Sequence, residues 1–179
     1  MFSFIKDQIK TIKIKDPAIK STLEVFLYPS FKAQFYHKIS NFFYRHKLYF
    51  LARLISEFAK RRTGIEIHPG ATIKNGLFID HGFGAVIGET AVIYENVTIF
   101  HGVTLGCTGK EKTKKRHPTI LSGAFIGSGA KVLGNITVGK NAKIGANAVV
   151  LKDVPDGKTV VGIPGYIVTK KRRQNIFYF

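Results

Sequence analysis

The spacing of apolar residues changes near Thr63-Gly64, which divides the chain into two parts. In the first part, large apolar residues recur every three or four positions and glycine is rare. The clearest stripes are Phe35, Ile39, Phe42 and Phe43, then Leu51, Leu54, Ile55 and Phe58. This spacing predicts two or three amphipathic helices whose apolar sides form core rather than a cofactor site. Asp16-Pro17 is typical of a helix start, with Asp16 as N-cap and Pro17 in the first turn.

The second part follows a period of six. The first register is Ile67, Ile73, Ile79, Ala85, Ala91, Val97 and Val103, and a second, two residues behind, is Ile87, Ile93, Ile99 and Leu105. After an interruption the repeat resumes as Ile120, Ile126, Val132, Val138, Ile144 and Val150. So short a unit cannot bury its own apolar face, so copies must stack into a solenoid whose short strands pair in parallel.

The interruption, residues 106–118, has no apolar register and contains several lysines. In a solenoid such an insertion must leave the stack as a loop. Loops held on a rigid scaffold are common places for binding groups.

Composition fits one globular domain. The chain has 179 residues, and 45% of them are hydrophobic, which suffices for a sizeable core and argues against global disorder. Cys107 is the single cysteine, so an intramolecular disulfide framework and a cysteine-rich zinc site are excluded. A lone cysteine also suits a reducing compartment.

The formal charge of +17 suggests nucleic acid or an anionic membrane as a partner. However, the basic residues are scattered, their densest runs are residues 110–117 and 170–173, and no nucleic-acid motif is present. We therefore expect neither partner, and favour a small polyanionic ligand. No stretch approaches the roughly 18 apolar residues of a spanning helix. The N-terminal segment lacks the apolar centre of a signal peptide, so we expect a cytoplasmic location.

Several short sequences resemble the serine O-acetyltransferases, which are hexapeptide-repeat acyltransferases. They are DPA in the first part, then IHPGA, IDHG, GETA, VTLG followed by TG, and RHP. The resemblance implies a short-form member with a mainly β fold, a left-handed parallel β-helix with an N-terminal helical region. The helical region is expected at 1–63, the β-helix at 64–168 with loop 106–118, and a basic tail at 169–179.

The resemblance also implies acetyl transfer from acetyl-CoA to the hydroxyl of L-serine, the first step of cysteine biosynthesis. Acetyl-CoA would be a co-substrate, with no permanently bound cofactor and no metal. A serine hydroxyl is a poor nucleophile at neutral pH, so a base must take its proton as it attacks the thioester. By family position that base is His81. Glu66, where many relatives have Asp, is the carboxylate that orients the imidazole. The two residues are 15 positions apart, less than one family coil, so they can lie close at the edge of adjacent coils.

The family holds the serine ammonium with two aspartates, matched here by Asp16 and Asp80. It holds the carboxylate with Arg116, whose guanidinium suits a bidentate pair. His117 is expected to hold substrate or to pair with Asp80. Taken alone, Asp16 is equally a helix cap and Arg116 a solvated charge; the joint order of the motifs favours function. For the CoA phosphates, the candidates by family position are Gly106, Gly127, Ser128, Lys143, Gly145 and Ala146.

The chain departs from the family pattern at three places. Cys107 replaces the second glycine of VTLGGTG, and Gly165-Tyr166 replaces an alanine and a basic residue, where residues 170–173 may be substitutes for a phosphate contact. Long members end in a tail finishing in Ile that docks into O-acetylserine sulfhydrylase. This chain stops at Phe179, so we do not expect that complex. The family forms active sites between subunits, and the short N-terminal region favours a homotrimer, with a dimer of trimers left open.

Three other functions remain open from sequence. The same fold can acetylate a sugar hydroxyl, although a neutral sugar does not need both an anionic and a cationic clamp. An inactive solenoid can bind nucleic acid or an anionic surface through its charge. A β-helix hydratase would need three convergent histidines around zinc, which the six histidines here fit less well.

Overall fold

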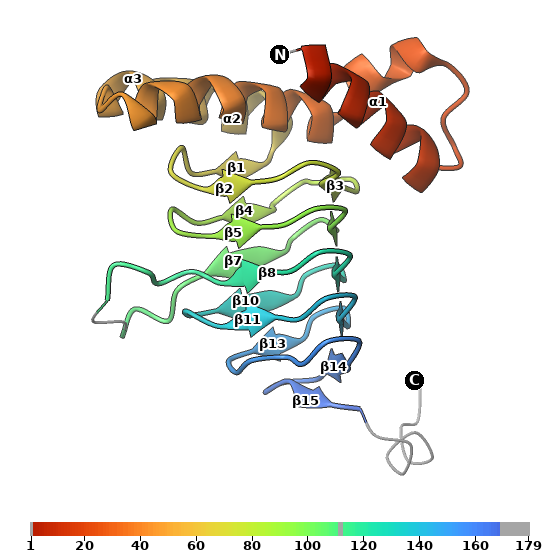
Figure 1. Ribbon diagram of the computed structural model, residues 1–179, viewed down its shortest axis with the longest axis vertical. Coiled ribbons are helices and arrows are strands. Elements are labelled where there is room, and N and C mark those ends of the chain that lie inside the picture. The colour runs from red at the N-terminus through yellow and green to blue at the C-terminus, as the bar shows by residue number, and fades with distance from the viewer. Residues whose placement is uncertain (1, 111–112, 169–179) are drawn as a thin grey trace.

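The computed structural model describes residues 2–110 and 113–168 as a stack of β-strand coils covered at one end by helices (Figure 1). The predicted tail 169–179, with its basic run 170–173, lies outside the described residues, as do Glu111 and Lys112 of the predicted loop. None of the helices within the described ranges is long and apolar enough to cross a bilayer.

Three sheets form the sides of the stack, and each coil adds one strand to each sheet. Sheet A contains β1 (Glu66–Ile67), β4 (Val86–Ile87), β7 (Thr104–Gly106), β10 (Lys131–Leu133) and β13 (Val149–Val150). Sheet B contains β2 (Thr72–Ile73), β5 (Val92–Ile93), β8 (Thr119–Ile120) and β11 (Thr137–Val138). Sheet C contains β3 (Phe78–Ile79), β6 (Thr98–Ile99), β9 (Phe125–Ile126), β12 (Lys143–Ile144), β14 (Thr159–Val161) and β15 (Tyr166–Ile167).

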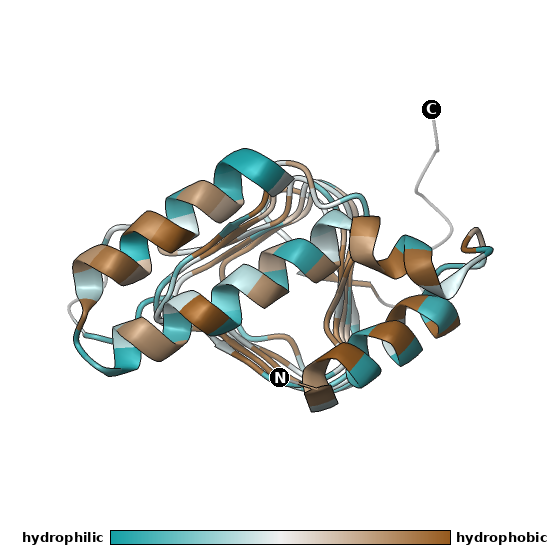
Figure 2. Cartoon of the chain, turned by 90° about the horizontal axis from the view of Figure 1, so that it is seen from above, coloured by the Kyte–Doolittle hydropathy of each residue, from teal (hydrophilic) through white to brown (hydrophobic). Residues whose placement is uncertain are grey.

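The neighbours within these sheets pair in parallel, except β14 and β15, which are antiparallel. Seen from above, the strands enclose a triangular prism (Figure 2). The repeat residues fill its interior as one continuous cluster, in which Ile93, Ile99, Ile120 and Ile126 are fully buried. The fold is thus the predicted left-handed parallel β-helix, and stacking of coils buries what no single coil can bury.

The spacing between coils explains why the sequence shows two apolar registers. Glu66 pairs with Val86, 20 residues on, whereas Val86 pairs with Thr104, 18 residues on. Ile67 therefore aligns with Ile87 of the second register, not with Ala85 of the first. The two additional residues lie in the corner between β3 and β4, which contains Asp80 and His81. The first coil is longer than the regular one where the candidate base is located.

The helical layer lies across the open end of the prism. It contains α1 (Phe2–Lys15), the 3₁₀ helix η1 (Thr22–Leu27), α2 (Pro29–Arg45) and α3 (Tyr49–Thr63). Helices α2 and α3 run side by side over the first coil (Figure 2). Side chains join the two layers: Ser56 Oγ donates to Ile67 O at 2.9 Å, and Asn41 Nδ2 donates to Pro69 O at 2.7 Å. These bonds satisfy carbonyl groups of the uppermost coil that have no further strand above them.

The predicted helix start at Asp16-Pro17 is wrong, because a helix ends there. The Asp16 N–H still bonds to Ile12 O at 2.9 Å, closing the last turn of α1. A residue before proline disfavours helical backbone, so the chain leaves the helix at this point. Asp16 instead accepts from the N–H of Ala18 at 2.8 Å, in a turn. It is Pro29 that occupies the first turn of a helix, α2.

Candidate active site

The corners between sheets C and A stack into one edge of the prism, here called the C–A edge. Backbone bonds connect one corner to the next: Gly102 N–H donates to Phe83 O at 2.9 Å, and Gly129 N–H to His101 O at 2.9 Å. Asn147 N–H then donates to Ser128 O at 2.8 Å. The corners that carry His81, His101 and Ser128 therefore follow one another along a rigid line.

His81 projects from the longest of these corners. Its backbone is left-handed, with φ of 56°, a conformation that costs energy for a residue other than glycine and occurs most often at functional sites. Its side chain is 74% exposed, with Nε2 lying 3.8 Å from Asp80 Oδ1. The His101 ring lies 6.0 Å from the His81 ring, centroid to centroid. The imidazole is thus presented to solvent beside a carboxylate.

Asp16 reaches the same edge from the end of α1. Its Oδ2 accepts from the Tyr28 hydroxyl at 2.5 Å, and its Oδ1 from the Ala18 N–H. These two bonds, the Tyr28 bond first, lower the pKa of the Asp16 carboxyl, and nearby His81 lowers it further. The same bond raises the pKa of Tyr28 to about 12, with a smaller contribution from Asp80. The structure therefore brings Asp16, Asp80 and His81 together as an anionic cluster around an imidazole.

Glu66 lies on sheet A, in β1, and contacts a different group. Its Oε2 is 3.3 Å from Lys60 Nζ of α3, and its side chain is 33% exposed. The recorded carboxylate neighbour of His81 is Asp80, at the distance given above. The pairing of Glu66 with His81 stays a prediction.

Arg116 and His117 lie at another edge, between sheets A and B, here called the A–B edge. Arg116 Nη2 donates to Glu89 Oε2 at 2.7 Å, and the Tyr44 hydroxyl donates to Glu89 Oε1 at 2.8 Å. These bonds, led by that from Tyr44, lower the pKa of Glu89. Arg116 is thereby held by a fixed anion although half of its side chain is exposed.

His117 is tied to the same corner by Thr90. The Thr90 N–H lies 3.1 Å from His117 Nδ1, and Thr90 Oγ1 lies 2.9 Å from that atom. Burial lowers the pKa of His117, and the positive charge of Arg116 lowers it further, so the ring is neutral at neutral pH. Lys115 Nζ donates to Thr90 O at 2.8 Å and also to His117 O. The end of the loop is thus pinned to the stack.

One chain does not bring the two groups together. The cluster of Asp16, Asp80 and His81 follows β3 of sheet C, whereas Arg116 and His117 precede β8 of sheet B. Sheet A separates the two edges. The alternative of a pair between His117 and Asp80 is therefore not formed within this chain.

Most of the candidates for CoA lie on the C–A edge. Gly127 and Ser128 directly follow β9, and Gly145 and Ala146 follow β12, so both pairs stand in corners along the line that begins at His81. Lys143 is exposed on β12 of the adjoining sheet C. Gly106, in contrast, ends β7 on sheet A. A side chain at Gly127 would approach the Ala146 nitrogen to 2.8 Å, so glycine is needed for the corners to stack this closely.

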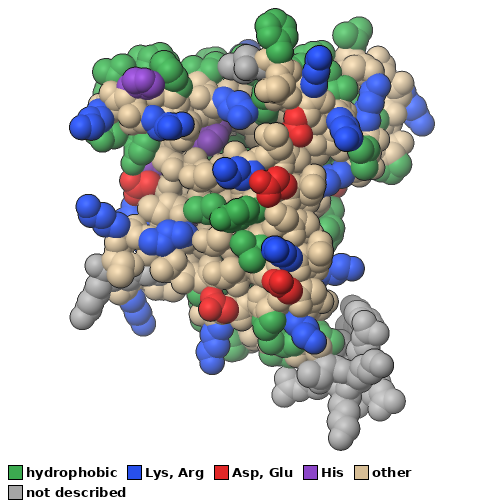
Figure 3. Space-filling model, viewed as in Figure 1, with side chains coloured by type: hydrophobic (Ala, Val, Ile, Leu, Met, Phe, Trp, Pro, Cys, Tyr) green, Lys and Arg blue, Asp and Glu red, His purple; other side chains and the backbone are tan. Residues whose placement is uncertain are grey.

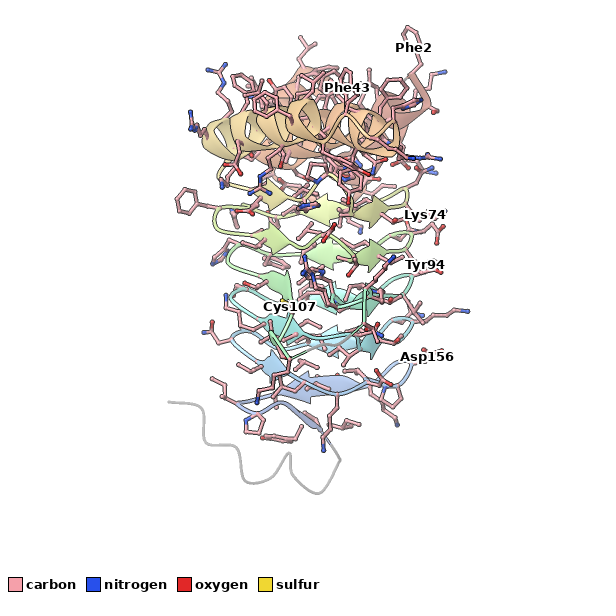
Figure 4. The ribbon with its side chains drawn as sticks, turned by 90° about the vertical axis from the view of Figure 1, so that its left-hand side faces the viewer. Phe2, Phe43, Lys74, Tyr94, Cys107 and Asp156 are labelled. Carbon is pink, nitrogen blue, oxygen red and sulfur yellow. The ribbon has the colours of Figure 1, made fainter. Side chains whose placement is uncertain are left out.

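The three departures from the family pattern lie in different places. Cys107 is exposed where the loop leaves β7 (Figure 4). Gly165 precedes β15, and its N–H donates to Val149 O at 2.6 Å. The third concerns the terminal segment outside the described residues.

Sequence reasoning missed four residues that hold the candidates: Tyr28, Tyr44, Glu89 and Thr90. Glu89 and Thr90 belong to the GETA sequence, and their polar side chains at a solenoid corner are a usable signal. The two tyrosines are far from their partners in sequence and carry no such signal. Only the packing of the helices on the coils reveals them.

Gly88 provides a test of the geometry around His117. A methyl group at Gly88 would lie 2.1 Å from His117 Cδ2, so Gly88→Ala must turn the ring away from Thr90. We expect a stability loss of about 1 kcal/mol and lower turnover, because a partly buried hydrogen bond is lost. Thermal denaturation and an activity assay measure the two effects. The Gly88→Ala/His117→Ala double variant should be more stable than Gly88→Ala alone, and wild-type behaviour of Gly88→Ala would contradict the contact.

Comparison with known proteins gives consistent matches. Residues 117–152 match the profile of the family described as bacterial transferase hexapeptide (six repeats). The serine acetyltransferase of Bacillus pumilus is 59% identical over 97% of this chain and 80% of that protein. A crystal structure of the Brucella abortus serine acetyltransferase in complex with coenzyme A has a TM-score of 0.90 at 40% identity, over 93% of this chain and 67% of that one. The Neisseria gonorrhoeae enzyme in complex with serine has a TM-score of 0.87 at 40% identity, over 92% and 68%.

Proposed function

The chain belongs to the serine acetyltransferases, and we propose that it transfers the acetyl group of acetyl-CoA to the hydroxyl of L-serine, giving O-acetyl-L-serine and CoA. The observation that carries this proposal is the cluster of Asp16, Asp80 and His81 on one exposed edge. It offers a base for a hydroxyl and anions for an ammonium, which an amino-acid alcohol requires together. The product would enter cysteine biosynthesis.

In the proposed mechanism, His81 removes the proton of the serine hydroxyl as that oxygen attacks the thioester carbonyl. The proton then passes to the departing thiolate of CoA. A carboxylate beside the ring stabilises the imidazolium that forms. Asp80 already lies 3.8 Å from Nε2. Glu66 takes the orienting role once its side chain turns from Lys60, which its partial exposure permits.

Binding of serine is assigned to both edges. Asp16 and Asp80 hold the ammonium, and Arg116 holds the carboxylate through its guanidinium. His117, neutral and fixed by Thr90, contacts the substrate from the same side as Arg116. Acetyl-CoA lies along the C–A edge, where Gly127, Ser128, Gly145 and Ala146 present backbone groups below His81, with Lys143 nearby and Gly106 contributing from sheet A.

The position of the two groups on separate edges supports a homotrimer as the active form. If sheet A of each subunit faces a threefold axis, the C–A edge of one subunit meets the A–B edge of the next. Each active site then takes His81 from one subunit and Arg116 from its neighbour. The outer face of the helical layer carries exposed Phe50, at 84%, and Phe58, at 49%, which supports a dimer of trimers as a further state.

The alternatives predict different ligands. A sugar acceptor would leave the anionic and cationic groups at the two edges without a charged partner. On the face shown in Figure 3, Lys and Arg side chains are scattered with Asp and Glu among them, a distribution that disfavours a nucleic-acid surface. A cytoplasmic location is proposed because acetyl-CoA and an exposed cysteine both suit a reducing compartment.

A thiol-release assay tests the proposal. We expect release of CoA from acetyl-CoA that depends on L-serine, and little release without an acceptor. Amino sugars and neutral sugars are the matched acceptors. Faster release with a sugar than with serine would establish the alternative transferase, and no release with any acceptor would favour the binding solenoid.

A further inference from the structure

Tyr28 lies where two segments of the helical layer meet. It follows η1 and precedes α2, whose first residue is Pro29. Its ring packs partly buried against the cluster formed by Phe4, Ile12, Val25, Phe31 and Phe78. Its hydroxyl lies 2.5 Å from Asp16 Oδ2. An aromatic ring held on one side by core residues thus aims a single donor at a single carboxylate.

The backbone at Asp16 is anchored separately, by Lys15. Lys15 Nζ donates to Asn96 O at 3.0 Å, to Val97 O at 3.1 Å and to Thr98 Oγ1 at 2.9 Å. It also donates to Gly76 O, at 3.3 Å, in the coil above. Burial lowers the pKa of Lys15 to about 8. The end of α1 is therefore clamped to two successive coils independently of Tyr28.

With the backbone fixed, the orientation of the carboxylate is what remains to be set. The Ala18 N–H occupies Oδ1 at 2.8 Å, and the Tyr28 hydroxyl occupies Oδ2. Each carboxylate oxygen accepts two bonds, so each keeps one free position for an ammonium group. Rotation of the carboxylate about its last bond would move these free positions away from His81, whose charge Asp16 senses.

We propose that Tyr28 is a positioning residue for the substrate ammonium: its hydroxyl fixes the Asp16 carboxylate so that the free acceptor positions face the amino group of an α-amino acid. This inference rests on the proposed function. It assigns to Tyr28 a part in selecting acceptors that carry an ammonium beside the reacting hydroxyl. It assigns no contact between Tyr28 and the acetyl donor.

The test is the variant Tyr28→Phe, which removes the hydroxyl and keeps the ring. Loss of a hydrogen bond to a charged group should raise the KM for serine about tenfold or more. Both kcat and the KM for acetyl-CoA should change less than about threefold, because the base and the donor site are untouched. Tyr94→Phe is the matched control, since Tyr94 is 37% exposed in a corner of another edge and should leave all constants unchanged (Figure 4).

A double-mutant cycle separates positioning from a general structural role. If Tyr28 acts through Asp16, then Tyr28→Phe in an Asp16→Asn background should alter the KM for serine less than about twofold. The pH profile gives a second readout. The Tyr28 bond is the largest cause of the lowered Asp16 pKa, so its removal raises that pKa and the loss of kcat/KM for serine should grow as pH falls toward about 5.

Titration of ¹³C-labelled aspartate carboxyls by NMR measures the Asp16 pKa without any turnover. It should rise in Tyr28→Phe, and denaturation midpoints confirm that the variant is folded. Additive losses in the Asp16→Asn background, an equal rise of the KM for acetyl-CoA, or an unchanged Asp16 pKa would overturn the role of Tyr28. Absence of serine-dependent thiol release in the wild-type protein would instead refute the proposed function, while the NMR result would still stand.

Discussion

Replacing His81 with alanine should lower turnover by about 10² or more while leaving the fold and the assembly intact. General base catalysis contributes roughly this factor, and no other described imidazole lies as close to Asp80. The side chain is largely exposed, so its removal leaves no cavity in the core. Steady-state thiol release under saturating serine and acetyl-CoA measures the effect.

The left-handed backbone at His81 calls for a second variant. With φ at 56°, alanine adds strain that asparagine tolerates better. His81→Asn should therefore lose as much turnover as His81→Ala and lose less stability. His46→Ala, at the exposed end of α2, is the matched control and should keep full activity. Turnover of His81→Asn close to that of wild type would remove His81 from the role of base.

Replacing Arg116 with alanine should raise the KM for serine about 10- to 100-fold, the second largest effect. A bidentate, charge-assisted pair with a carboxylate contributes about 1.5–3 kcal/mol. Loss of Arg116 also leaves Glu89 beside the substrate carboxylate without its cation. Repulsion between the two anions adds to the loss of the bond. The KM for acetyl-CoA, which does not depend on this pair, should stay near its wild-type value.

Two further variants make the result specific. Arg116→Lys should recover only part of the affinity, because an ammonium cannot form the planar double contact. Lys114→Ala removes a charge from the exposed part of the same loop and should leave the KM for serine unchanged. If Lys114→Ala and Arg116→Ala have equal effects, the loop acts only through its overall charge.

The fold was largely predictable because its energetics are periodic. A six-residue repeat leaves few ways to bury Ile93, Ile99 and their equivalents, and stacking is the one that pairs every strand. The helix boundary at Asp16 was not predictable in the same way. Aspartate before proline fits both a helix start and a helix end, and the buried face of α1, with Phe4, Gln8 and Ile12, decides in favour of the end.

The candidate residues were predictable from motifs, but their arrangement was not. The two-residue extension that exposes His81 is visible in the sequence only as a shift between two apolar registers. That the cluster around His81 and the pair Arg116-His117 occupy separate edges follows from which sheets flank each corner. Contacts such as Tyr28 with Asp16 and Tyr44 with Glu89 depend on how helices settle on the coils, which no local pattern encodes.

Mixed assemblies of two inactive subunits test most directly that the site forms between chains. Subunits carrying His81→Asn and subunits carrying Arg116→Ala, with different tags, are expressed together and the mixed assemblies purified. In a symmetric trimer with random mixing, about a quarter of the sites would combine an intact His81 with an intact Arg116 from the neighbour. Activity should therefore recover to about that fraction of wild type at low serine concentration, far above either variant alone. Activity no greater than the mean of the two variants would mean that both residues serve one site within a single chain, and would contradict the account.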